Sequence, residues 1–166
     1  MRKYSIVMTV VFSVLFIVFN GHCAEEAKQD TVLRGVVTIT NNIKINVEIV
    51  SDGEAEIGLS GRSGFDKNMG MIIKARKPKF ESSYNHIWMN QMKFSIDIIW
   101  IYQGKIVHIV KNALPPNENR FIPIYGLYAG SEISKNYTFD VLEVNAGFVE
   151  CHGIKTGDTI IVQEIK

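Results

Sequence analysis

Apolar and polar residues alternate strictly between Ile43 and Ile49. The apolar positions are isoleucines and a valine, each two residues apart: Ile43, Ile45, Val47 and Ile49. A period of two places these side chains on one buried face of a β-strand. Asn41-Asn42 precedes the strand, and because asparagine tolerates positive φ, this dipeptide favours a hairpin turn after residues 35–40.

A second hairpin is predicted at residues 95–102 and 105–110, joined by a turn at Gln103-Gly104. Its strands carry apolar side chains on both faces. In the first strand, Ile96, Ile98 and Trp100 occupy one face, and Ile99 and Ile101 the other. Strands of this kind lie between two packed layers. We therefore expect this hairpin in the middle of a sandwich or closed sheet, and not at its edge.

Shorter signals complete the pattern. Ser51-Asp52 can cap a short helix that ends near Gly58 or Gly61, and Gly153 can end another across residues 146–152. Further strands are predicted at residues 70–75, 137–144 and 159–163, and proline-containing loops at 77–85 and 112–125. About seven short strands with one or two short helices predict a mainly β domain, a small sandwich or barrel.

Residues 1–24 follow a different pattern. Arg2 and Lys3 precede an apolar run from Ile6 to Phe19, which small or polar residues follow. This order is typical of a secretory signal, and the run of about 14 residues is shorter than the roughly 20 that a spanning helix needs. We predict a signal peptide over 1–24, a flexible polar lead-in over 25–34 and a single domain over 35–166. The alternative to a periplasmic or secreted protein is an inner-membrane anchor.

Composition limits the partners. The net charge is +1 without a basic block, so neither nucleic acid nor an anionic membrane surface is indicated. We expect membrane contact only if the N-terminal apolar segment is retained. The cysteines are Cys23 and Cys151, and removal of the leader leaves one, so no internal disulfide is expected.

Several motifs, taken in order, resemble the bacterial family called domain of unknown function 192. They are Gly58-Leu59 with Arg62, Gly70-Met71-Ile72, Trp88-Met89 with Asp97-Ile98, residues 142–147, and His152-Gly153-Ile154 with Gly157-Asp158. The resemblance runs from about Val47 to Val162. It implies a compact, mostly β domain, often behind an export signal, and it implies no particular reaction.

The chain departs from that family at one place. Members usually follow the Trp-Met pair with lysine, asparagine and threonine, whereas this chain has Asn90, Gln91 and Met92. If the lysine serves a ligand or a carboxylate, the cation is missing here. A function that rests on this charge is therefore not expected of this chain.

Two carboxylates occupy positions that the strand period buries. Asp97 shares a face with Ile99 and Ile101, and Glu143 shares one with Phe139 and Val141. Burying a carboxylate without a partner costs several kcal/mol, so each must accept hydrogen bonds, pair with a cation or bind a proton. They can form an acid–base pair or bind a hydroxylated ligand. The preferred interpretation is structural: Asp97 holds amides near Trp88, and Glu143 holds those of residues 145–147.

Two further positions, Arg62 and Trp88, are candidates for binding. Arg62 is the cation expected beside one of the carboxylates, because a planar guanidinium suits a buried carboxylate better than an ammonium does. Trp88 can stack on a sugar or another ring, but core packing is expected of an aromatic residue beside a β core. The histidines show no ligand spacing, so no metal or cofactor is expected.

These observations favour an exported binding or accessory module of the periplasm or envelope, with a small molecule or an envelope protein as its partner. Its predicted surface lies where the segments of Arg62, Trp88-Asn90-Gln91 and Glu143 converge. The alternative is a small carboxylate-dependent hydrolase or carbohydrate-active enzyme that uses Asp97 and Glu143.

Overall fold

The computed structural model describes residues 33–74, 86–117, 121–126 and 138–165, which all belong to one compact unit spanning residues 31–166. The predicted leader, most of the polar lead-in, the predicted loop at 77–85 and Tyr137 lie outside the described residues. The described residues form a mainly β domain with two short α-helices, which confirms the predicted class.

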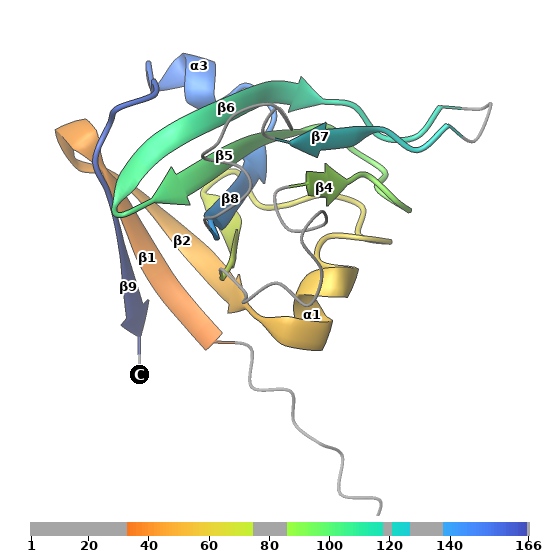
Figure 1. The fold of residues 1–166 in the computed structure, drawn as a ribbon, viewed down its shortest axis with the longest axis horizontal. Helices are drawn as coiled ribbons and strands as arrows, with labels where there is room; N and C mark the ends of the chain where they lie inside the picture. Colours follow the sequence, from red (N-terminus) through yellow and green to blue (C-terminus); the bar gives the residue numbers. More distant parts are fainter. Residues whose placement is uncertain (1–32, 75–85, 118–120, 127–137, 166) are drawn as a thin grey trace, which may run out of the picture. The chain divides into compact units, whose positions relative to one another are not determined.

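Seven strands form one sheet in the order β6-β5-β8-β3-β2-β1-β9 (Figure 1). Neighbouring strands are antiparallel, except that β2 and β3 are parallel. The strands are β1 (Leu33–Ile39), β2 (Ile43–Val50), β3 (Met69–Ile73), β5 (Ile96–Tyr102), β6 (Lys105–Ala113), β8 (Asp140–Asn145) and β9 (Ile160–Ile165). The smaller elements are β4 (His86–Trp88), β7 (Ile124–Gly126), the 3-10 helix η1 (Thr40–Asn42), α1 (Asp52–Ile57) and α3 (Phe148–Cys151).

Local sequence signals account for several of these elements. Asn41 and Asn42 both have positive φ, +66° and +64°, in the turn between β1 and β2, as the hairpin prediction required. Gly58 and Gly153 have positive φ just after α1 and α3, where glycine can end a helix at no steric cost. The strands predicted at 70–75, 137–144 and 159–163 correspond to β3, β8 and β9, with small shifts at their ends.

The sheet curls until its two ends meet near the β5–β6 turn (Figure 1). The Ile160 amide donates to the Gly104 carbonyl at 2.9 Å, and the Gly157 amide donates to the Ile106 carbonyl at 2.8 Å. A bridge between Lys105 and Thr159 lies between these bonds. The domain is therefore a half-barrel that is closed at one end.

The prediction that both strands of the β5–β6 hairpin lie away from the edge is wrong for β6. Every residue of β5 from Ile96 to Ile101 is buried, but β6 is the edge strand and is partly exposed from Val107 to Val110. An apolar pattern on both faces indicates that other layers cover the sheet above and below. It carries no information about neighbours in the hydrogen-bonding direction, where β6 lacks a second partner beyond its first residues.

The two faces of the sheet bury separate apolar clusters. The α3-side core includes Ile72, Ile99, Leu142 and Val144, together with Val149 of α3. The β4–β7-side core includes Met71, Ile98, Trp100 and Val141, together with Met89 and Met92. The small sheet of β4 and β7 packs on this second core through Ile87 and Tyr125. This sheet is a correction to the prediction of one long loop over residues 112–125.

Candidate functional site

Asp97 is fully buried, and its carboxylate holds two backbone amides. Oδ1 accepts a hydrogen bond from the Asn112 amide at 2.8 Å, and Oδ2 accepts one from the Val149 amide at 2.9 Å. Asn112 lies at a bulge in β6, where it has φ +53°, and Val149 lies in the first turn of α3. The structural interpretation holds for Asp97, although its partners are not in the Trp88 segment.

Glu143 lies in the middle of β8, on the opposite face from Asp97. Its register partners are Met71 of β3 and Ile98 of β5, and both belong to the β4–β7-side core. Register partners on neighbouring strands project to the same face of a sheet. Glu143 therefore points into this second core, and it is 4% exposed.

No residue that the structure describes donates a hydrogen bond to the Glu143 carboxyl group. The predicted bonds to amides of residues 145–147 are absent: the Ala146 amide donates instead to the Ser95 carbonyl at 3.4 Å. Burial disfavours the charged form and raises the pKa of the Glu143 carboxyl to about 7, although the positive charge of Arg62 lowers it in part. Both protonation states of this carboxyl are therefore accessible near neutral pH.

The positive charge of Arg62 lowers the pKa of Glu143, but the hydrogen bonds of Arg62 are to the carboxylate of Glu48. Its two terminal nitrogens donate to the two oxygens of Glu48, at 3.0 Å and 2.7 Å. The guanidinium carbon also lies 5.6 Å from the centre of the Phe65 ring. These contacts fix the guanidinium plane, since a bidentate pair constrains both position and orientation.

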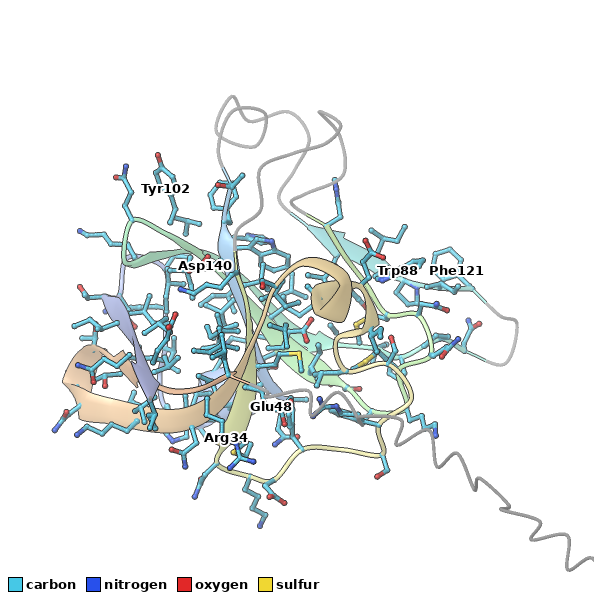
Figure 2. The ribbon with its side chains drawn as sticks, turned by 90° about the horizontal axis from the view of Figure 1, so that it is seen from below. Arg34, Glu48, Trp88, Tyr102, Phe121 and Asp140 are labelled. Carbon is cyan, nitrogen blue, oxygen red and sulfur yellow. The ribbon has the colours of Figure 1, made fainter. Side chains whose placement is uncertain are left out.

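Glu48 places the Arg62 pair on the same face as Glu143. Glu48 of β2 is the register partner of Met71, which is the register partner of Glu143. With strands about 4.8 Å apart, the two glutamates lie roughly 10 Å apart across β3. Glu48 is also the register partner of Arg34, and both are labelled in Figure 2. Glu48, Arg62 and Glu143 form what we call the charged row.

The segment of Arg62 is bonded to the segment of Asn90 and Gln91. The Ser60 hydroxyl donates to the Asn90 carbonyl at 2.8 Å, and the Gly61 amide donates to the Gln91 carbonyl at 3.0 Å. Gln91 has φ +56°, so its turn is tightly folded. The structure therefore brings together the Arg62 and Asn90–Gln91 segments, with Glu143 beneath them in the sheet.

The prediction that Trp88 packs in the core is wrong. Trp88 is 54% exposed at the end of β4, while its neighbour Ile87 packs on the β4–β7-side core. The tryptophan buried in the core is Trp100 of β5. Period-two alternation in β4 explains the difference, because adjacent residues of a strand face opposite ways.

The two candidate carboxylates do not meet. Asp97 is the register partner of Val144, the residue after Glu143, so the two carboxyl groups point to opposite faces of the sheet. A cleft that holds both as acid and base is incompatible with this geometry. Chemistry at one carboxyl would have to proceed without the other.

Sequence reasoning did not identify Glu48, Phe65 or the apolar residues around β7. Glu48 occupies a polar position of an alternating strand, where nothing distinguishes it from a solvated residue. Phe121, Ile122 and Ile124 fall in a proline-containing segment that predicts a loop. The sequence did not indicate that these three large apolar side chains are exposed. The one available signal was the density of large apolar residues in that segment.

Two structural features are absent from the described part of the chain. There, no three His, Cys, Asp or Glu side chains are grouped so that they could hold a metal ion. Among the same residues, no helix has the length and hydropathy needed to cross a membrane.

Solved structures resemble this domain. A crystal structure from Sinorhizobium meliloti 1021, of a protein provisionally named a transcription regulator, matches 78% of this chain and 92% of its own, with a TM-score of 0.56 and 24% identity. A protein of unknown function from Novosphingobium aromaticivorans DSM 12444 matches 78% of this chain and 84% of its own, with a TM-score of 0.57 and 26% identity. No curated protein matches the chain.

The family resemblance of the motifs is confirmed over most of the domain. A family model described as "Uncharacterized ACR" matches residues 36–162, which include every strand from β2 to β8 and most of β1. The chain therefore belongs to the domain of unknown function 192 family, DUF192.

Proposed function

We propose that this domain is an exported ligand-binding module of the periplasm or cell envelope, and that its ligand is bound at the charged row. The observation that carries the proposal is the contrast between the two buried carboxyl groups. Asp97 has two amide donors, whereas Glu143 has none among the described residues. A structural carboxylate would be expected to resemble Asp97.

An unpartnered buried polar group costs about 1–3 kcal/mol of folding free energy. A ligand that donates a hydrogen bond to Glu143, for which no described residue is a donor, recovers this cost on binding. With a pKa of about 7, the Glu143 carboxyl can donate and accept in its neutral form, and accept in its charged form. This chemistry suits a hydroxyl or amide group of the ligand.

The charged row is partly accessible to solvent at the end opposite Glu143. Arg62 has a side chain that is 38% exposed, and its partner Glu48 is 19% exposed, so the row reaches solvent. The backbone carbonyls of Asn90 and Gln91 are bonded to Ser60 and Gly61, next to Arg62 in the sequence. The leader pattern of residues 1–24 supports the proposal that the domain is exported to the envelope.

Thermal-shift titration of the purified chain tests the proposal, with N-acetylglucosamine oligosaccharides and short peptides as probes. We expect one class to raise the melting temperature of the wild-type protein. Glu143→Leu should abolish the shift, and Glu143→Gln should retain part of it because an amide also donates and accepts. Glu164→Gln on the exposed part of β9 is the control and should not change it. A shift that survives Glu143→Leu would place the ligand elsewhere.

A second candidate is an enzyme that uses Glu143 alone as general acid or base. The observation that favours it is the pKa of about 7, since a carboxyl poised near the working pH transfers protons efficiently. In that case chromogenic glycosides or esters would be turned over with a pH profile that changes near 7. Glu143→Gln would then abolish turnover while leaving binding of the same compound in place.

A further inference from the structure

The outer face of the small β4–β7 sheet has the wrong polarity for a surface in water. Ile87 and Tyr125 are register partners that pack inward on the core. Two register pairs face outward: His86 with Gly126, and Trp88 with Ile124, of which Trp88 and Ile124 are 54% and 65% exposed. A sheet that covers a core normally alternates apolar inward with polar outward. Here one of the two outward pairs, Trp88 and Ile124, is apolar as well.

Neighbouring residues extend this surface. Of the nine large apolar side chains exposed among the described residues, five gather on or beside β4 and β7: Trp88, Leu114, Phe121, Ile122 and Ile124. We call these five the β4–β7 apolar face. Trp88 and Phe121 project on the same side of the domain in Figure 2. Contiguous exposed apolar surface of this kind marks an interaction site.

Hydrogen bonds hold this face in place. The Met89 amide donates to the Pro123 carbonyl at 3.0 Å, and the Leu114 amide donates to the Tyr125 hydroxyl at 3.0 Å. The first bond joins the end of β4 to the start of β7, and the second joins the end of β6 to β7. Trp88 and Ile124 are therefore presented by paired strands, and Leu114, Phe121 and Ile122 lie in the segments next to these strands.

Two lysines lie close in sequence to the strands that flank this face. Lys93 and Lys111 are exposed, and both lie within three residues of the Ile96–Ala113 register pair, at the end of the hairpin that leads to β7. The acidic residue described between 86 and 126 is Asp97, which is buried and bonded to amides. In the sequence, Glu118 and Arg120 offset each other. An apolar surface with flanking lysines complements an anionic lipid interface, where Trp residues are preferred.

We infer that the β4–β7 apolar face rests on the interfacial region of an anionic lipid bilayer. The Trp88, Phe121 and Ile124 side chains enter the headgroup and acyl boundary, and Lys93 and Lys111 face the acidic headgroups. Membrane-surface binding of this type sums buried apolar area and attraction to anionic lipid. This contact does not depend on a ligand at Glu143.

Tryptophan fluorescence of the full chain tests this inference directly, because the protein contains two tryptophans and Trp100 is fully buried. With vesicles of phosphatidylglycerol and phosphatidylethanolamine, we expect the Trp88 emission to shift to the blue and brominated acyl chains to quench it. Phosphatidylcholine vesicles should give a weaker response. Quenching reports Trp88 itself, so it is informative whether or not the N-terminal segment is retained.

Matched variants separate this face from general stickiness. Ile124→Ser should weaken partitioning by about tenfold, the scale for one large apolar side chain. Ile161→Ser on β9, which is similarly exposed, should leave it unchanged. Absence of quenching, equal partitioning into phosphatidylcholine, or no effect of Ile124→Ser would overturn the inference. So would burial of Trp88 in a dimer, or against a protein partner, without lipid.

Discussion

Asp97 and Glu143 lie one register step apart on adjacent strands, but only Asp97 accepts hydrogen bonds from described residues. The Asp97 carboxylate accepts two backbone N–H groups at 2.8 Å and 2.9 Å. Glu143 is surrounded by apolar side chains. It interacts with Arg62 electrostatically, without a hydrogen bond. The period of the strands was sufficient to predict that both are buried. It could not reveal the partners of Asp97, because Asn112 and Val149 are distant from it in sequence.

The raised pKa of Glu143 predicts a specific pH dependence of stability. The folded protein holds this proton up to about pH 7, whereas a glutamate titrates at 4.5 when unfolded. The contribution to stability is therefore complete below about pH 4.5 and is lost as the pH rises through 7. At 1.36 kcal/mol per unit, the loss is about 3 kcal/mol. Glu143→Gln cannot ionise, so urea unfolding should show its advantage over wild type growing from pH 5 to pH 8.

A variant at Arg62 gives a second test of the pH dependence of stability. Its positive charge lowers the pKa of Glu143, so Arg62→Met should raise that pKa above 7 and steepen the loss of stability at high pH. In the double variant with Glu143→Gln, this additional slope should disappear. A pH profile that is the same in wild type and in Glu143→Gln would show that the Glu143 carboxyl is not desolvated.

Elements with strong local signals were predictable, and those defined by distant pairing were not. The β1–β2 hairpin, β5 and α3 follow from alternation, from a positive-φ turn or from a glycine stop. β4 and β7 have three residues each and are too short for a period. Their pairing becomes visible only when residues 86–88 and 124–126 meet. The edge position of β6 could not be predicted either, because the apolar pattern of one strand does not show which strands pair with it.

Asp97 links two elements, which sets the expected effect of its removal. One oxygen binds the amide that the β6 bulge leaves unpaired, and the other caps the first turn of α3, where Gly147 offers no side chain. Asp97→Ala should lower the free energy of unfolding by about 2 kcal/mol or more, measured by urea denaturation. Asp97→Asn keeps one acceptor oxygen and should lose less. An unchanged denaturation midpoint for Asp97→Ala would contradict this role.

At the scale of the whole molecule, the closed end of the half-barrel and both cores are formed within residues 33–165. A protein that begins near Ala24 should therefore fold and remain monodisperse without detergent or reductant, as measured by circular dichroism and light scattering. A requirement for detergent in this shortened protein would contradict the prediction. The family and the half-barrel follow from motifs and alternation, while the charged row and the β4–β7 apolar face emerge only in three dimensions.

The first and last strands of the domain are neighbours: β1 lies between β2 and β9, and β9 also ties down the β5–β6 turn. A chain threaded through a translocation channel from its N-terminus delivers β9 last. Until residues 157–165 emerge, β1 has a single partner and the barrel seam stays open. If the chain is exported as proposed above, the sheet would stay incomplete until this last strand has crossed.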